Sequence, residues 1–190
     1  MKTIKVLFLL LFLIVIVWVL YCLITLPNLA GLGNKTRFPS ISVLDDNNKI
    51  MGSSGDVYAG SIKIDDISRN LIKAVIFTED RSFYNHWGID SKSILRAVVI
   101  NIINLGYEQG FSSLTQQVAR TLYDTIGFKK TITRKIKEII TAIQIERTYT
   151  KDEILEMYLN NVHFGHGTYG VQVAAKRYFK KDVSLLTLGE

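Results

Sequence analysis

The sequence predicts a mainly α-helical domain that follows a single N-terminal transmembrane helix and a short β-hairpin. Three observations support this prediction. Residues 6–26 form a run of 21 residues without a charge, and roughly 20 apolar residues span a ~30 Å hydrocarbon core. Short apolar segments flank the polar residues 45–48, as in a hairpin. From residue 65 onward, apolar residues recur at helical spacing.

The 190 residues leave room for one globular domain and a short appendage, because a domain takes about 100–200 residues. The apolar run exceeds the about 7–15 residues of a cleaved signal peptide, so we expect it to remain attached. We divide the chain into a cytoplasmic n-region at 1–5, a transmembrane signal anchor at 6–26, a linker with the β segment at 27–60, and the helical domain at 61–190.

The charges that flank the span are nearly balanced. Lys2 and Lys5 precede it, while Lys35 and Arg37 follow it, so the positive-inside comparison does not decide the orientation. We place the N-terminus in the cytoplasm because the span is single and because the substrate inferred below lies outside. The net charge of +6 suits anionic lipid or phosphate-bearing substrates, and the membrane anchor argues against nucleic acid.

The helical domain is predicted to contain a series of amphipathic helices. The first begins near Asp66 and ends near Glu79. Thr150 and Glu153 make a capping box at the start of a later helix, and Ser184 is expected to cap the last one. That helix has barely begun where the chain ends, so either the domain is C-terminally truncated or the protein stops early. The other expected helices are 91–106, 112–125, 132–150, 150–161 and 167–179.

The stretch TEDRSFYNHWG, residues 78–88, places a carboxylate at an unfavourable position. Glu79 lies at the C-terminal end of its predicted helix, where the helix dipole disfavours negative charge. If this end faces a cleft, burial would favour protonation and let Glu79 accept a proton near neutral pH. The alternative is that Asp80 and Arg81 form a surface ion pair and that His86 is a satisfied loop or core residue.

Two further stretches carry groups that suit a phosphate. In GFSSLTQQVAR, residues 110–120, hydroxyls can cap a helix, while Gln116 and Arg120 share one helix face and could jointly grip a sugar or phosphate. In KKTITRKIKE, Arg134 and Glu138 are i and i+4 neighbours, which an intrahelical salt bridge would explain. A diphosphate leaving group would explain the stretch too, because it needs concentrated positive charge as the bond breaks.

The glycine-rich segment VHFGHGTYG brings two histidines close together. His163 and His166 are three residues apart, but a zinc site needs further ligands, and no convincing one is nearby in the sequence. We therefore assign no metal ligand with certainty, and expect the glycines to serve close packing of a loop against a helix.

In this order, TEDRSFYNHWGI, GFSSLTQQVAR, RKIKE and KDEILEMYLNNVHFGHGTYGVQVAAKRYF resemble the glycosyltransferase family 51 domain. This is the peptidoglycan glycosyltransferase, or transglycosylase, domain of penicillin-binding proteins and of monofunctional enzymes. The resemblance covers about residues 66–190. It implies a lysozyme-like, mainly helical fold, and a transferase of cell-wall biogenesis that polymerises membrane-bound lipid II into glycan strands.

The resemblance also implies roles for particular residues. The catalytic residues would be Glu79 and Glu138. Glu79 matches the general base, which takes the proton from the acceptor's 4-hydroxyl, and Glu138 matches a supporting glutamate beside the diphosphate. The hydroxyl attacks C1 of the donor with inversion, and undecaprenyl pyrophosphate leaves. The expected substrate-binding residues are Asp80, Arg81, Phe83, His86, Ser112, Gln116, Gln117, Arg120, Arg134 and Lys135.

Cofactors and partners follow from the same resemblance. Mg²⁺ or Mn²⁺ beside Glu138 is the one cofactor left open, and no organic cofactor is expected. The expected partners are lipid II, the growing lipid-linked glycan, the membrane and other cell-wall synthesis proteins, with no nucleic acid. The family motif usually has threonine and lysine where this chain has Ser113 and Arg120. No Ser-x-x-Lys occurs in the chain, so no transpeptidase activity is expected.

Two rival functions remain open at this point. A lysozyme-like enzyme would cleave glycan with a carboxylic acid as proton donor, but it would have no use for the basic group at 134–138. A catalytically degenerate relative would act as a membrane-anchored scaffold protein of the cell-wall machinery.

Overall fold

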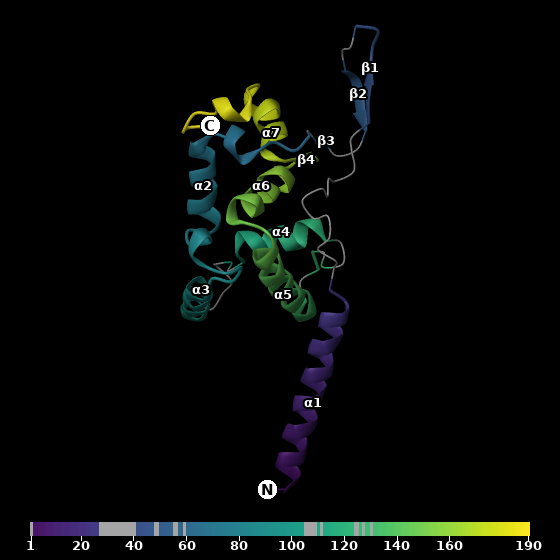
Figure 1. The fold of residues 1–190 in the computed structure, drawn as a ribbon, viewed down its shortest axis with the longest axis vertical. Coiled ribbons are helices and arrows are strands. Elements are labelled where there is room, and N and C mark those ends of the chain that lie inside the picture. The colour runs from purple at the N-terminus through teal and green to yellow at the C-terminus, as the bar shows by residue number, and fades with distance from the viewer. Residues whose placement is uncertain are drawn as a thin grey trace.

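The protein consists of a helical domain joined to one long N-terminal helix, α1, Lys2–Ile24 (Figure 1). Among the described residues, the segment Ile4–Ile24 of α1 is the one helix that is long and apolar enough to cross a membrane. Its apolar side chains are mostly exposed, as a lipid-facing helix requires. The computed structural model describes residues 2–26, 41–47, 50–54, 57–58, 60–104, 110, 112–123, 126, 128–129 and 131–190.

Helices make up most of the described domain, which confirms the predicted mainly α class. Short 3₁₀ turns and one π turn link or extend them, at Ile64–Asp66, Phe83–Asn85, Ala175–Phe179 and Val183–Leu185. The helices are α2 (Arg69–Glu79), α3 (Ser91–Ile103), α4 (Leu114–Leu122), α5 (Ile132–Thr148), α6 (Lys151–Asn161) and α7 (Val171–Ala174).

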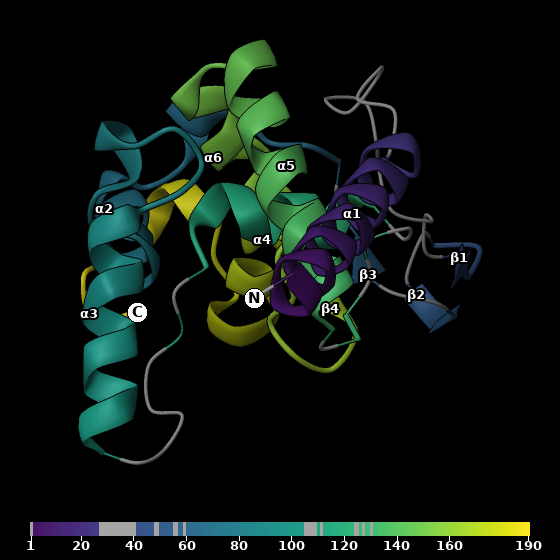
Figure 2. The same cartoon turned by 90° about the horizontal axis from the view of Figure 1, so that it is seen from below.

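The apolar core lies where α4, α5 and α6 pack together. Leu114, Ile145, Ile154, Leu155 and Leu159 are fully buried there, and each such side chain stabilises the fold by about 1.5–3 kcal/mol relative to exposure. Viewed from below, α2 and α3 lie on one side of this group and α1 on the other (Figure 2).

The helix boundaries agree with the sequence where local chemistry sets them. Thr150 and Glu153 form the predicted capping box at the start of α6, and α2 ends at Glu79 as expected. The start of α2 differs from the prediction. The chain makes a 3₁₀ turn at Ile64–Asp66 and then becomes extended at Ile67, so the helix begins at Arg69.

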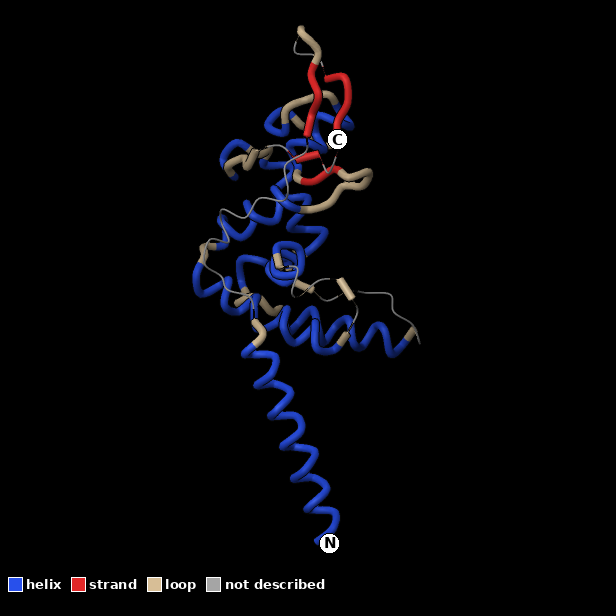
Figure 3. Tube along the Cα trace, turned by 90° about the vertical axis from the view of Figure 1, so that its right-hand side faces the viewer, coloured by secondary structure: helices blue, strands red, loops and turns tan. Residues whose placement is uncertain are grey.

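The predicted hairpin is present as β1, Ile41–Leu44, and β2, Ile50–Ser54, which pair antiparallel. Figure 3 shows this hairpin at the end of the molecule opposite the N-terminus. A parallel pair, β3 (Val57–Tyr58) with β4 (Thr168–Tyr169), was not predicted. Residues 48–49 of the expected turn lie outside the described part of the chain.

The segment predicted as a helix at 167–179 begins with β4 instead. Gly170 separates strand from helix with a positive φ of 81°, and a Cβ there would lie 2.7 Å from the carbonyl oxygen of Asn160. Only glycine accommodates both constraints without strain. The expected cap at Ser184 was also wrong, because Asp182 caps the turn Val183–Leu185 and accepts a hydrogen bond from the Ser184 N–H.

The C-terminal end of α1 packs against the first half of α5. Trp18 Nε1 donates a hydrogen bond to Thr133 Oγ1 over 3.2 Å, and Lys137 Nζ lies 5.6 Å from the centre of the Tyr21 ring. Cys22, one turn beyond Trp18, is fully buried. The apolar helix α1 therefore contacts the same helix that carries Arg134, Lys135 and Glu138.

Candidate active site

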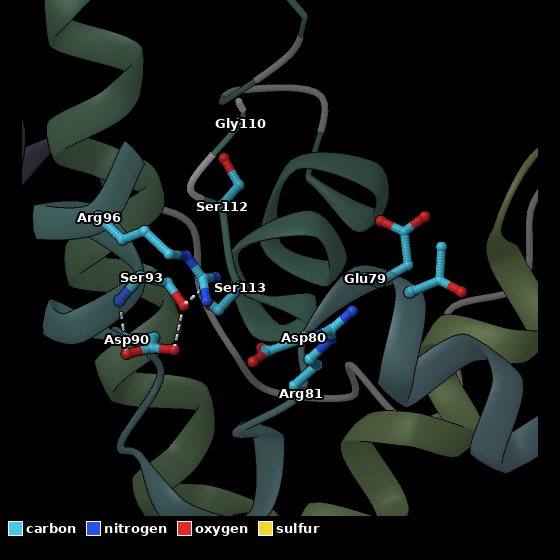
Figure 4. A pocket seen from close by; sticks show the side chains of 10 residues that line it. Glu79, Asp80, Arg81, Asp90, Ser93, Arg96, Gly110, Ser112 and Ser113 are labelled. Carbon is cyan, nitrogen blue, oxygen red and sulfur yellow. Dashed lines mark hydrogen bonds between the residues drawn. The ribbon is translucent and has the colours of Figure 1, made fainter. Parts of the chain in front are cut away.

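The last residue of α2, Glu79, lines a cavity of about 430 Å³. Figure 4 shows Glu79 on one side of this cavity and Asp90, Ser93 and Arg96 on the other. The remaining lining residues come from the ends of α2 and from the segment before α4: Thr78, Asp80, Arg81, Gly110, Ser112 and Ser113.

The Glu79 carboxylate is exposed at this cavity rather than enclosed in it. The helix end does face a cavity, but the burial that the sequence argument made conditional on a cleft is absent, because the Glu79 side chain is exposed. The side chain is nevertheless held, since Gln117 Nε2 of α4 donates a hydrogen bond to Glu79 Oε2 over 3.0 Å. Glu79 therefore points toward α4 while remaining accessible to a substrate hydroxyl.

Tyr158 of α6 lies within the electrostatic reach of Glu79. Burial and then the negative charge of Glu79 raise the pKa of Tyr158 above its usual range, and the positive charge of Arg120 opposes them. The phenol is therefore neutral, and it lies close enough to Glu79 and Arg120 to interact electrostatically with both. The sequence argument did not select Tyr158, because nothing in its local pattern separates it from a core tyrosine.

Glu138 has the opposite environment to Glu79. Its side chain is completely buried in α5 and faces three cations: Arg134 Nη1 at 2.7 Å, Lys135 Nζ at 3.2 Å and Arg120 Nη1 at 3.8 Å. The predicted i,i+4 pair of Arg134 and Glu138 is thus present as part of a larger group. We call Arg120, Arg134, Lys135 and Glu138 the inner cation cluster.

Lys135 connects the inner cation cluster with the cavity. Its Nζ donates to Ser112 Oγ and to Gln116 Oε1, both over 2.8 Å, and to Glu138 Oε2. Burial lowers the pKa of Lys135, and the neighbouring Glu138 offsets this only in part. Because Ser112 also lines the cavity, a single hydrogen bond separates the cluster from the space that Glu79 borders.

Two consecutive glutamines of α4 reach the two charged parts of the site. Gln116 is buried and accepts from Lys135, while Gln117 donates to Glu79. Ser113 sets the start of α4 by accepting from the Gln116 N–H, and its hydroxyl donates to the carbonyl of Gly88. The helix start therefore fixes both glutamines at once, which spacing alone did not predict.

Unsatisfied donors remain on the inner cation cluster. Within the described residues, the buried Nε atoms of Arg120 and Arg134 have no hydrogen-bond acceptor. Buried polar groups normally find partners, so these two N–H groups are exceptions among the buried donors of the described residues.

Asp80 and His86 hold the loop after α2 in place. The Asp80 carboxylate accepts from the Leu114 N–H at 3.0 Å and from His86 Nε2 at 2.9 Å. His86 Nδ1 accepts from the Gly88 N–H, so the ring proton lies on Nε2 and points at Asp80. Both side chains are thus engaged in positioning the loop, and the plainer interpretation of His86 as a satisfied residue holds.

The expected contact of Phe83 with substrate was wrong for this conformation. Phe83 is fully buried in the core, and Lys151 Nζ lies 4.5 Å from its ring centre. The alternative of a surface ion pair between Asp80 and Arg81 is not what the structure shows, because Arg81 Nε donates to the carbonyl of Phe77 instead. Arg81 lines the cavity, as a substrate-binding role requires.

Three cavity residues on α3 were not selected from the sequence: Asp90, Ser93 and Arg96. Asp90 caps α3 and accepts from the Ser93 N–H, from Ser93 Oγ and from Ser82 Oγ. Burial alone would raise the pKa of Asp90, but these hydrogen bonds outweigh it and hold the pKa below its usual range. The sequence located the start of this helix at residue 91, and Asp90 is the N-cap aspartate directly before it.

A metal ion does not fit beside Glu138, because three cations already face its carboxylate. Within the described ranges, no group of three histidine, cysteine, aspartate or glutamate side chains is arranged to hold a metal. His163, which sequence spacing left unassigned, stacks against Tyr169 with ring centres 4.7 Å apart.

The helical domain, its cavity and an N-terminal helix that is long and apolar enough to span a membrane fit a lysozyme-like transglycosylase domain. The chain belongs to the transglycosylase family, whose model matches residues 47–190. This agrees with the predicted resemblance and covers nearly all of the extramembrane part.

Individual relatives agree with the family assignment. Over 155 residues the chain is 43% identical to penicillin-binding protein 1F of Bacillus subtilis, which covers 78% of this chain and 21% of that protein. It is 41% identical over 165 residues to penicillin-binding protein 1A of Neisseria lactamica, covering 87% of this chain and 20% of the relative. With penicillin-binding protein 1A of Vibrio cholerae the identity is 39% over 165 residues. The chain thus spans about a fifth of the length of these relatives.

Proposed function

We propose that this protein polymerises peptidoglycan glycan strands from lipid II by inverting glycosyl transfer. One observation carries the proposal: Glu79 lines a cavity that the inner cation cluster reaches through the hydrogen bond of Lys135 to Ser112. The consecutive residues Gln117 and Gln116 of α4 contact Glu79 and Lys135. A transfer that removes a proton from one sugar and a diphosphate from another needs both kinds of group at one site.

Glu79 acts as the general base in this proposal. It takes the proton from the 4-hydroxyl of the acceptor's N-acetylglucosamine, and the oxygen attacks C1 of the donor's N-acetylmuramic acid. Gln117 keeps the carboxylate turned toward α4 during this step. The exposure of Glu79 lets the acceptor approach, and the bound sugars then exclude water from the carboxylate.

The inner cation cluster stabilises the leaving group. As the bond between C1 and the phosphate oxygen breaks, its electron pair leaves with undecaprenyl pyrophosphate. Lys135 exchanges its contact with Ser112 for a phosphate oxygen, while the free Nε–H groups of Arg120 and Arg134 offer further donors. Glu138 touches no substrate and serves as a positioning residue, which holds three cations in one place.

The location follows from the substrate. Lipid II lies in a bilayer, and a membrane-anchored enzyme meets it at high effective concentration. We propose that α1 spans the bacterial cell membrane with its N-terminus in the cytoplasm and the domain outside. The residues around Glu138 do not accommodate Mg²⁺ or Mn²⁺, so no step is assigned to a metal.

The test is incubation of the purified full chain in detergent with labelled lipid II. We expect lipid-linked polymer of increasing length. Cleavage of finished glycan strands would instead identify a lysozyme-like hydrolase, and the absence of both reactions would identify a scaffold protein. Either of these two results would overturn the proposal.

A further inference from the structure

Arg120 has the longest contact with Glu138 among the three cations of the inner cation cluster. Its Nη1 lies 3.8 Å from Glu138 Oε1, whereas Arg134 and Lys135 donate hydrogen bonds to this carboxylate over 2.7 Å and 3.2 Å. A separation of 3.8 Å exceeds the range of a hydrogen bond. Glu138 therefore attracts Arg120 but does not fix the orientation of its guanidinium.

The neighbouring cations oppose the position of Arg120. Three cations share the single carboxylate of Glu138. Burial lowers the pKa of Lys135, and the positive charges of Arg134 and Arg120 lower it further, although Glu138 acts in the opposite direction. Because like charges repel, the guanidinium of Arg120 would turn away from the cluster unless another group held it.

Phe128, four residues before the start of α5, is such a group. The guanidinium carbon of Arg120 lies over its ring, 5.8 Å from the ring centre. This is within the about 6 Å at which the face of an aromatic ring attracts a cation. Core packing does not account for the ring, because Phe128 is 64% accessible. The contact with Arg120 therefore gives this exposed aromatic side chain a role at the site.

An aromatic ring can hold a cation without neutralising it. A carboxylate beside Arg120 would form an ion pair and compete with a diphosphate for the N–H groups of the guanidinium. The face of the Phe128 ring carries only partial negative charge from its π electrons. Phe128 therefore orients Arg120 but takes up none of its charge.

We propose that Phe128 is a positioning residue for glycosyl transfer, which holds Arg120 in the orientation that stabilises the departing diphosphate. This inference rests on the proposed function. Phe128 acts through Arg120 and is assigned no contact with the reacting atoms. Arginine suits this arrangement because its planar guanidinium stacks on an aromatic face while its edge presents N–H groups to a phosphate. The stacking would also account for arginine at position 120, where the family motif usually has lysine.

The first experiment removes the ring but keeps an apolar side chain. The full chain carrying Phe128→Leu is titrated in detergent with inorganic diphosphate, and its turnover of lipid II is measured. Both the affinity and the turnover should fall about two- to fivefold, as expected for the loss of an exposed cation–π contact. The thermal midpoint should stay unchanged because the ring is exposed. Phe128→Tyr keeps the aromatic face and should retain wild-type values.

A second experiment tests whether the effect passes through Arg120. In an Arg120→Gln background there is no guanidinium to orient, so adding Phe128→Leu should cause no further loss of diphosphate affinity. The cations of Arg134 and Lys135 remain in this background and keep the binding measurable. Phe8→Leu is the matched control, because Phe8 of α1 is an aromatic residue of similar exposure, 69% accessible. This control should leave both the affinity and the turnover unchanged.

Three results would overturn the assignment of Phe128. One is an unchanged diphosphate affinity in Phe128→Leu. Another is an equal loss in the wild-type and Arg120→Gln backgrounds, since Phe128 would then act independently of Arg120. The third is a loss of the same size in Phe128→Tyr, since the aromatic face would then not matter. Wild-type protein that binds inorganic diphosphate but makes no polymer would instead count against the proposed function, and the diphosphate titrations would still test Phe128.

Discussion

The two glutamates of the site occupy contrasting parts of the molecule. Glu79 ends α2 at the edge of the cavity, is exposed, and accepts a hydrogen bond from the amide of Gln117. Glu138 lies in the middle of the packed helices, is completely buried, and faces three cations. The first carboxylate is open to an additional group, whereas the second is surrounded by its cation partners.

This contrast indicates different roles for the two residues: a chemical role for Glu79 and a structural role for Glu138. A general base must be free to accept a proton, and Glu79 keeps that freedom at an unfavourable helix end. A group that collects cations must instead remain ionised and fixed. Removing one partner of a buried charge group costs about 3–5 kcal/mol, so Glu138 is expected to contribute mainly to stability and to the shape of the cluster.

The largest expected effect is that of Glu79→Gln on turnover. Glutamine has nearly the same shape and cannot accept the proton, so polymerisation should fall by about 10²–10⁴-fold. The thermal midpoint should hardly change, because the side chain is exposed. Polymerisation of lipid II and thermal unfolding measure the two effects. Near-normal turnover of this variant would show that Glu79 is not the general base, and the two glutamates would then not differ in the way described.

Glu138→Gln should have the opposite profile. It leaves the positive charges of Arg120, Arg134 and Lys135 without their buried partner, and the loss of about 3–5 kcal/mol should lower Tm by roughly 10 °C. The control is Glu190→Gln, which breaks a peripheral pair with Lys181 and should leave Tm nearly unchanged, because exposed ion pairs contribute little to stability. Equal thermal midpoints for the two variants would refute the structural role of Glu138.

Gln117→Ala should have a smaller effect on the reaction. It removes the hydrogen bond that orients Glu79, which is worth roughly 1.5–3 kcal/mol for a charged acceptor. Turnover should fall about tenfold or more, with little change in lipid II binding. In a Glu79→Gln background the same substitution should lower turnover no further. An equal loss in both backgrounds would show that Gln117 acts elsewhere.

The smallest effect should appear in the pH dependence of Lys135→Arg. Burial lowers the pKa of Lys135, so with rising pH its charge is lost earlier than that of an ordinary lysine. The affinity for inorganic diphosphate should therefore decline on the alkaline side in the wild type and persist to higher pH in the arginine variant. Glu138 raises the pKa of Lys135, so Glu138→Gln should move the wild-type decline to lower pH. Coincident profiles would contradict the assignment.

The sequence was informative where the decisive contact is local. The capping box of Thr150 with Glu153 and the pair of Arg134 with Glu138 lie within one helical turn, and both are present as predicted. The hairpin β1–β2 likewise depends on neighbouring residues.

The contacts between helices could not be predicted in this way. Gln117 meets Glu79, and Lys135 meets Ser112, only because α4 packs between segments distant along the chain. The burial of Phe83 is another result of packing, since an aromatic residue in a charged loop looks the same in the sequence whether it faces the core or a substrate. The strands β3 and β4 are too short to show any periodicity.

The contact of Trp18 with Thr133 joins α1 to α5. It therefore fixes the height of the proposed active site relative to α1. A lipid-linked sugar is confined to the surface of the bilayer. The proposed reaction therefore requires the reactive side chains to lie at the height of that surface. A helix that only anchored the domain, without packing against it, would leave the height and tilt of the domain variable. Thr133 and Lys137 of α5 contact α1 beside the cations of the site. Exchanging α1 for an unrelated transmembrane helix would therefore keep the protein anchored but lose the contacts that set the height of these cations.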